Sequence, residues 1–288
     1  MSNMVINTNV LALNSHRSMK NVGATQAQAS SRLSSGLRIN SAADDAAGLA
    51  ISEKMRAQIR GLDMASKNAQ DGSSMVQTAE GGMQQIDSMI QRARELTVQA
   101  ANDTNDEKDR GKIAQEIDNL FKEIDSMSDR VEFNGKKLIN GAYASTGSIY
   151  LQVGANTNQS IQFSISGLNI SGLSLNTLAS TISGAATSGI WSDTASTIDS
   201  YLSDFDVALK YVTDERAKLG AIQNRLEYTM KSLDISSENL SASESRIRDA
   251  DMAKEMMTLT KTNVLSQAAT SMLAQANQAP QNILQLLK

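Results

Sequence analysis

The residues best suited to chemistry in this chain are a single histidine and two groups of carboxylates. His16 is the only histidine, and the chain has no cysteine. A zinc site needs several nitrogen or sulfur ligands, and a catalytic triad needs a nucleophile beside a base. His16 therefore predicts neither kind of site, and we expect it to lie on the surface of a helix.

The aspartates cluster at two points of the sequence. Asp44 and Asp45 precede an apolar helical pattern, where carboxylates accept hydrogen bonds from the free amides of a helix start. Asp103, Asp106 and Asp109 lie in a polar stretch that lacks the ligand pattern of a calcium loop, so we predict a solvated loop. No glycine-rich phosphate loop followed by Lys and Ser or Thr occurs either. We predict no catalytic residues, no metal site and no cofactor.

The composition favours helix–helix contacts over a thick enzyme core. Hydrophobic residues make up 40% of the 288 residues, but aromatic residues only 3%, and there is one Pro. Small side chains suit slender helical contacts, and the near absence of Pro permits long helices. The net charge is −4 with both signs interspersed, which lacks the basic patch that nucleic acid requires.

No membrane insertion is expected, because no apolar run approaches the ~20 residues of a membrane span. The start of the chain lacks the basic and apolar regions of an ordinary signal peptide. On this ground alone the default location is the cytoplasm, and any export would use another route.

Apolar residues at alternating three- and four-residue steps dominate the pattern. This period predicts long helices that pack as in a coiled coil, over about 44–101, 107–131 and 195–235. A weaker pattern of the same period occurs at both ends of the chain: Ala12, Ser15, Met19, Val22, Gln26, Ala29 and Leu33 near the start, and Leu265, Ala269, Met272, Ala276, Ala279, Ile283 and Leu286 near the end. Terminal helices of this kind are marginal alone, so we predict that residues 1–35 and 255–288 are largely disordered in an isolated monomer.

The character changes between the second and third helical patterns. Ser148–Val153 and Ser160–Ile165 alternate apolar with polar residues, which predicts a β-hairpin within about 133–165. A Ser-, Gly- and Thr-rich reversal loop over 166–194, with room for a short helix, follows. The predicted fold is mainly α: an elongated antiparallel bundle of long helices with one β-hairpin and with the N- and C-terminal helices paired. We divide it into residues 1–43 with 236–288, and residues 44–235.

Several segments are similar to bacterial flagellins, and they occur in family order along almost the whole chain. They are Val5–Asn9, Arg32–Gly48, Gln91–Asn102, Phe133–Gly135, Leu151–Asn156, Leu219–Glu227, Ser245–Met252 and Gln278–Leu287. The resemblance implies a non-enzymatic subunit of the flagellar filament, with paired termini in an inner core and the long helices and hairpin in a surrounding layer. Only about 30 residues stand where the family usually carries its outer domains, so a short form without them is implied.

The resemblance also implies partners and a location. Such a subunit polymerises with itself, is held by an export chaperone, leaves the cell unfolded through the flagellar type III apparatus, and meets hook-associated junction and cap proteins in an extracellular filament. For the polymerisation core we propose Val10, Leu13, Leu265, Met272, Ile283, Leu286 and Leu287.

Two host-recognition sites follow from the same resemblance. A vertebrate cell-surface Toll-like receptor would contact Gln91, Arg92, Leu96 and Glu116, and a cytosolic NAIP-type sensor would contact Leu284, Leu286 and Leu287. The alternative for each of these residues is a role in subunit packing alone.

Two other classes of protein share parts of the pattern. A hook–filament junction protein has similar termini but does not form long filaments. A cytosolic coiled-coil scaffold would keep ordered ends inside the cell. Electron microscopy of the purified protein after seeding distinguishes all three.

Overall fold

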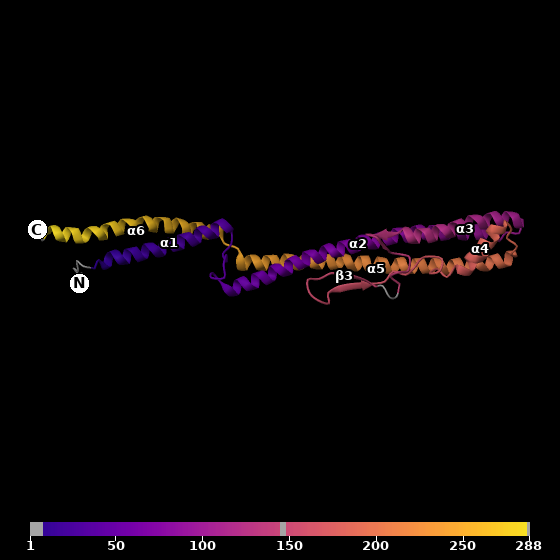
Figure 1. The fold of residues 1–288 in the computed structure, drawn as a ribbon, viewed down its shortest axis with the longest axis horizontal. Helices are drawn as coiled ribbons and strands as arrows, with labels where there is room; N and C mark the ends of the chain where they lie inside the picture. Colours follow the sequence, from indigo (N-terminus) through magenta and orange to yellow (C-terminus); the bar gives the residue numbers. More distant parts are fainter. Residues whose placement is uncertain (1–7, 145–147, 287–288) are drawn as a thin grey trace. The chain divides into compact units, whose positions relative to one another are not determined.

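The computed structural model describes residues 8–144 and 148–286, and these residues are predominantly helical (Figure 1). Six helices occur within those ranges: α1 Val10–Ser35, α2 Ala46–Ala100, α3 Glu107–Arg130, α4 Asn176–Ser188, α5 Ala195–Arg248 and α6 Met252–Leu286. The strands there are β1 Glu132–Phe133, β2 Lys136–Lys137, β3 Ile149–Gln152 and β4 Ser160–Phe163. The mainly α fold with long paired helices is confirmed.

The chain forms two compact units whose limits differ from the predicted division. Unit 2 is Arg60–Ser237, and unit 1 comprises the described residues on either side of it. The predicted limits lie near residue 44, where one helical pattern starts, and near residue 235, where another helix was expected to end. The helices themselves run on: α2 enters unit 2 without a break, and α5 continues to Arg248 because neither Gly nor Pro interrupts it after residue 235.

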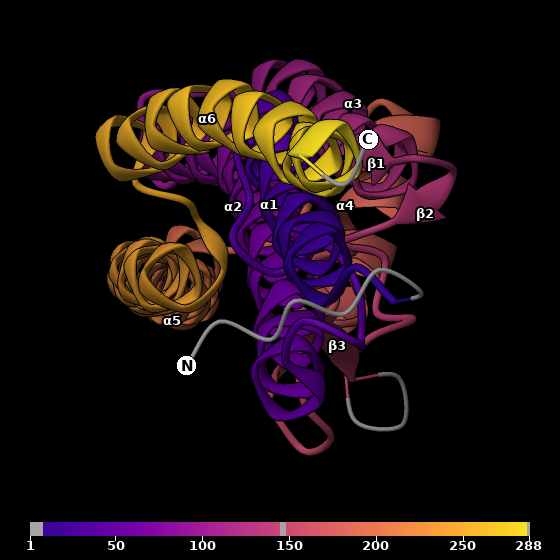
Figure 2. The same cartoon turned by 90° about the vertical axis from the view of Figure 1, so that its left-hand side faces the viewer.

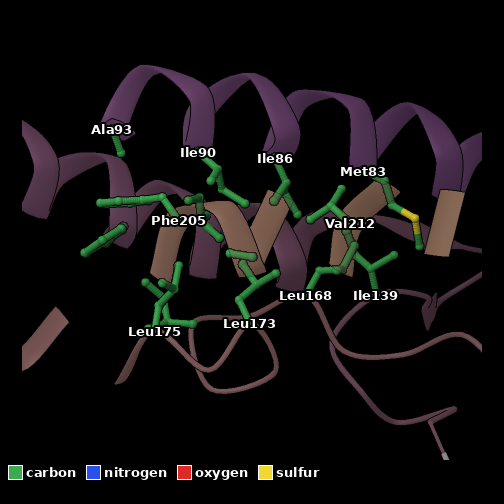
Figure 3. Packing of buried hydrophobic residues seen from close by; sticks show 14 of the residues in the cluster. Met83, Ile86, Ile90, Ala93, Ile139, Leu168, Leu173, Leu175, Phe205 and Val212 are labelled. Atoms are coloured by element: carbon green, nitrogen blue, oxygen red, sulfur yellow. The ribbon is translucent and has the colours of Figure 1, made fainter. Parts of the chain in front are cut away.

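The core of unit 2 lies between α2, α3, α5 and the segments that connect them. Met83, Ile86 and Ile90 of α2 are fully buried and point toward Phe205 and Val212 of α5 (Figure 3). Ile139, Leu168, Leu173 and Leu175 from the connecting segments close the same cluster. The predicted α2 pattern is thus buried along much of unit 2, whereas its first residue, Ile51 in unit 1, is 49% exposed.

The predicted hairpin is present, and a second, shorter one precedes it. β3 pairs antiparallel with β4, with Ile149 opposite Phe163 and Gln152 opposite Ser160. β1 and β2 are joined by Asn134 and Gly135, both with positive φ. Asn-Gly suits such a two-residue turn because its backbone twist matches that of the strands. Strands of two residues are too short to show alternation, so this hairpin was not predicted.

The predicted reversal loop contains an ordered helix. α4 spans 13 residues and packs on α3. Its inward side carries Leu178, Ile182 and Ala185, at steps of four and three residues. These three apolar side chains anchor a segment that otherwise consists of small and hydroxyl residues, which is why the sequence period was weak.

Of the two aspartates predicted at the start of α2, Asp45 has the expected role, whereas Asp44 accepts hydrogen bonds from the preceding turn. The Asp45 carboxylate accepts a hydrogen bond from the Gly48 amide at 2.9 Å, which caps the helix. The Asp44 carboxylate accepts hydrogen bonds from the Ser41 amide, the Ser41 hydroxyl and the Asn40 amide, and these hold its pKa below the usual value. At the other end of the chain, α6 continues through Pro280.

Candidate functional site: the α1–α6 surface

In unit 1, α1 and α6 lie side by side and antiparallel (Figures 1 and 2). The side chains of α1 predicted to form a pattern are all buried or half-buried: Ala12, Ser15, Met19, Val22, Gln26, Ala29 and Leu33. On α6 the buried and half-buried positions are Glu255, Thr258, Leu259, Thr262, Ser266, Ala269, Leu273 and Ala276. Steps of three and four residues between small side chains let two helices approach closely.

Polar contacts at three levels set the register of this pair. The Asn9 side-chain amide donates to the Ala276 carbonyl at 2.7 Å. The Gln26 amide donates to Asn263 Oδ1 at 2.8 Å, and Arg32 pairs with Glu255 at 3.2 Å. Because these contacts run in opposite order along the two helices, they favour one antiparallel alignment.

The segment after α1 is tied to the segment before α6. Gly36 ends α1 with φ +71°, a conformation that favours glycine. The Arg38 amide then donates to the Arg248 carbonyl at 2.7 Å, and the Ala250 amide donates to the Gly36 carbonyl at 2.9 Å. The Arg248 guanidinium is nearly buried and pairs with Glu53. These bonds align the start of α6 with the end of α1.

The α1–α6 pair leaves other apolar side chains uncovered in the single chain. Four of the residues predicted for polymerisation are exposed: Val10 by 56%, Leu13 by 60%, Leu265 by 43% and Met272 by 56%. Ile283 and Leu286 lie within α6, but the structure does not describe their side chains. Leu287 lies outside the described residues. The exposed side chains Leu11, Met257 and Val264 were not among the predicted residues.

Two of these predicted residues line a groove between the helices. Its volume is about 360 Å³, and its walls are formed by Leu11, Asn14, Ser15, Ser18, Val22, Leu265, Ala268, Ala269 and Met272. Small side chains between larger apolar ones form the kind of hole into which a side chain of another helix inserts. The groove is therefore suited to a helical partner.

The side of α6 that contacts α1 differs from the predicted one. Leu265, Ala269, Met272 and Ala276 were expected to form one pattern, but only the two alanines belong to the buried side. α6 is apolar on more than one side, so its sequence fits two alternatives. Pairing uses the side with the smaller residues, which leaves Leu265 and Met272 free for other contacts.

The residues predicted for a cell-surface receptor divide into an exposed group and one buried residue. Arg92 of α2 pairs with Glu116 of α3 at 3.0 Å and with Glu95 at 3.3 Å, and these carboxylates raise its pKa. Gln91 is also exposed and donates to Asp87 at 2.9 Å. Leu96, however, is only 2% exposed and belongs to the core of unit 2. Its prediction as a surface contact is wrong for this structure.

The remaining candidates for chemistry have structural settings. His16 is exposed on α1. Asp103 lies in the connection between α2 and α3, where it pairs with the buried Arg110 at 3.0 Å. Among residues 8–144 and 148–286, no group of three or more His, Cys, Asp or Glu side chains is arranged to hold a metal ion. No helix in the described part of the chain has the length and apolar character of a membrane span.

Comparison with known proteins identifies the family. The model of the bacterial flagellin N-terminal helical region matches residues 6–144, and that of the C-terminal helical region matches residues 202–287. A flagellin of Halalkalibacterium halodurans is 50% identical over 286 residues, which cover 99% of this chain and 100% of that protein. The chain belongs to the bacterial flagellin family.

Other similar proteins agree with this flagellin assignment. The flagellin of Bacillus subtilis is 48% identical and flagellin FlaB1 of Treponema pallidum is 41% identical, each over 99% of this chain and 100% of the relative. A solved structure of a putative flagellar hook-associated protein from Vibrio parahaemolyticus shares the fold, with a TM-score of 0.60 and 14% identity over 72% of this chain and 100% of that one. Flagellins are structural proteins of the flagellar filament, so this flagellin is a component of a motility filament and not an enzyme.

Proposed function

We propose that the uncovered apolar sides of α1 and α6 are the surface through which copies of this chain polymerise into the filament. The observation that carries the proposal is the exposure of Leu11, Leu265 and Met272 around a groove between α1 and α6. A filament requires contacts that repeat without closing, so one copy must present a different surface to each neighbour. The groove side of the helix pair and its outer side, with Val10 and Leu13, supply two such surfaces.

The composition of the α1–α6 contact supports coupling between assembly and order. Most of its buried and half-buried positions are small or polar residues, and the larger apolar ones are Met19, Val22, Leu33, Leu259 and Leu273, so each helix contributes little apolar area for its length. Full burial of a Leu or Met side chain stabilises by about 1.5–3 kcal/mol, and that gain is available only when a neighbour covers it. The terminal helices are thus weakly held in one copy and gain stability in the polymer.

Seeded polymerisation tests the proposal. Purified monomer mixed with short filament fragments should elongate them, as seen by electron microscopy. Amide exchange of residues 8–35 and 255–286 should be fast in the monomer and slow in the filament. A protein that binds fragment ends without extending them would be a junction protein. A protein that ignores the fragments and keeps slowly exchanging ends would be a scaffold.

Export and its partners belong to the same proposal. The chain leaves the cell unfolded through the flagellar type III apparatus, with a chaperone covering the apolar surface of α6 beforehand. At its destination it contacts hook-associated junction and cap proteins. The exposed Met256, Met257 and Leu265 support a need for such cover, because apolar side chains of this size aggregate when left open at cellular concentrations.

Host recognition forms the remaining part of the proposal. Gln91, Arg92 and Glu116 present an exposed charged surface on α2 and α3 to a Toll-like receptor. Leu284, Leu286 and Leu287 are proposed as contacts of a NAIP-type cytosolic sensor.

In a receptor reporter assay, Arg92→Ala should lower signalling at least about tenfold, because a central Arg contact contributes more than 1.4 kcal/mol. The matched control is Arg130→Ala, which removes another exposed, ion-paired arginine from α3. Equal signalling by Arg92→Ala and Arg130→Ala would remove the receptor assignment. Leu96→Ala is unsuitable as a test, since it would open a cavity in the core.

A further inference from the structure

The thioether groups of α6 are unusually accessible. The chain contains 14 methionines and no cysteine, so its oxidisable sulfur is in methionine alone. Met252, Met256, Met257 and Met272 of α6 are 48%, 52%, 67% and 56% exposed. By contrast, Met75 and Met83 in the core of unit 2 are 6% and 0% exposed.

The placement of these methionines matches the proposed assembly surface. Met257, Val264, Ala268 and Met272 follow one another at steps of seven, four and four residues, which places them along one side of the helix. Met272 also lines the groove beside Leu265 and Ala268. Met252 and Met256 lie one turn apart at the start of α6. Met257 and Met272 thus stand on the groove side of α6, whereas Met252 and Met256 lie on another exposed side of the same helix.

We propose that these four methionines form a reversible oxidation site that controls filament growth, with hydroperoxides as the oxidant. This inference rests on the proposed self-assembly through α6. A lone pair of the thioether sulfur attacks one peroxide oxygen, so that the O–O bond breaks and an S–O bond forms. With hydrogen peroxide the second oxygen leaves as water. The sulfur loses two electrons, the peroxide gains them, and the product is methionine sulfoxide.

Oxidation changes what the surface can bury. A sulfoxide is polar and accepts hydrogen bonds, whereas the thioether it replaces is apolar. Leu265 and Ala268 beside Met272 are apolar, so a polar sulfoxide there replaces the apolar surface that a neighbouring copy would cover. The association loses this apolar burial and must remove water from the sulfoxide oxygen, which disfavours it.

The fold itself is protected from the same reaction. Met75 and Met83 are shielded by the core of unit 2, so mild peroxide oxidises α6 before it reaches them. Met64, 55% exposed on α2 in unit 2, is oxidised as readily as the α6 methionines but lies on a different helix. It provides an internal control for exposure without a position on the assembly surface.

The experiment treats full-length monomer with hydrogen peroxide, removes the peroxide, and measures elongation of untreated filament seeds. Peptide mass spectrometry should show sulfoxide at Met64 and the four α6 methionines, with Met83 intact. We expect the elongation rate of oxidised protein to fall at least about tenfold, equivalent to a rise of about 1.4 kcal/mol or more in the activation free energy of subunit addition. Treatment with the A and B types of methionine sulfoxide reductase, which together reduce both sulfoxide epimers, should restore it.

Two variants locate the effect. The fourfold variant M252L/M256L/M257L/M272L should elongate seeds after peroxide treatment as it does before, since leucine conserves size and apolarity. Met64→Leu should remain as sensitive as the parent. The inference is overturned if oxidised parent elongates normally, if the reductases restore nothing, or if the fourfold variant loses elongation after peroxide to the same extent as the parent. Untreated parent that fails to elongate seeds would instead refute the proposed function.

Discussion

Replacing Leu265 and Met272 together by aspartate should abolish elongation of filament seeds while leaving the monomer folded. Both side chains are exposed in the single chain, 43% and 56%, so their replacement there costs little. In the filament each would lose about 1.5–3 kcal/mol of apolar burial. Burying the new carboxylates costs more. Together these losses lower the association constant by at least about 10²–10⁴-fold.

A matched control is available on the same helix. Gln267→Asp with Gln278→Asp adds the same charge to α6 at exposed polar positions on another side of the helix from Leu265 and Met272. Seeded elongation, followed by light scattering and electron microscopy, should be close to that of the parent for the control and absent for L265D/M272D. Far-UV circular dichroism should be the same for all three proteins. If L265D/M272D elongates seeds like the control, these residues do not lie at contacts between subunits.

Long repeated patterns made most of the helical architecture predictable. From Ala65 to Ala93 the buried residues of α2 recur with one period, and a pattern repeated over many turns outweighs irregular positions. Helix α6 shows the limit of this reasoning. Because apolar residues occupy two of its sides, periodicity allows either side to pair with α1. Only the three-dimensional contacts show that the side with Ser266 and Ala269 does so.

The candidate surface was predictable in part. Val10, Leu13, Leu265 and Met272 are exposed as an assembly surface requires, but Leu11 and Val264 belong to the same exposed set and were not predicted. Leu96 was assigned from the motif resemblance, which carries no information on side-chain direction. Its position three residues after Ala93 and four before Ala100, both fully buried, indicates the core side of the helix.

Contacts between residues distant in sequence were beyond the reach of pattern analysis. The segment 189–193, which leads into α5, packs against the start of α3: the Trp191 amide donates to the Glu107 carbonyl at 3.2 Å. A Cβ on Gly111 would come within 2.3 Å of the Gly189 carbonyl oxygen, so a glycine is needed there. Arg110 donates to the Asp193 carbonyl and pairs with Asp103. The start of α3, the connection between α2 and α3, and the segment 189–193 thus pack together in one small cluster, which no local sequence motif predicts.

Trp191 is the centre of that cluster, and its replacement by alanine should have the largest effect on the stability of unit 2. The side chain is 1% exposed and its ring stacks on Tyr201, with centroids 6.5 Å apart. Both the indole N–H and the Tyr201 hydroxyl donate to Asp193 Oδ2 at 2.9 Å. Loss of the indole leaves a cavity and removes one of these bonds, so Trp191→Ala should lower the free energy of unfolding by about 3–5 kcal/mol.

Urea unfolding followed by far-UV circular dichroism measures this change. Tyr228→Ala is the control, since that aromatic side chain is 72% exposed on α5 and its removal should cost under about 1 kcal/mol, mainly through its contact with Lys231. Burial, together with the hydrogen bond to the Asp193 carboxylate, also raises the pKa of Tyr201 to about 12. Because the folded state favours the protonated phenol, this contribution is complete below pH 10 and is lost as the pH rises from 10 to 12. In Tyr201→Phe the free energy of unfolding should therefore fall less steeply between pH 10 and 12. The role assigned to this cluster would be contradicted if that pH dependence were unchanged. It would also be contradicted if Trp191→Ala were as stable as Tyr228→Ala.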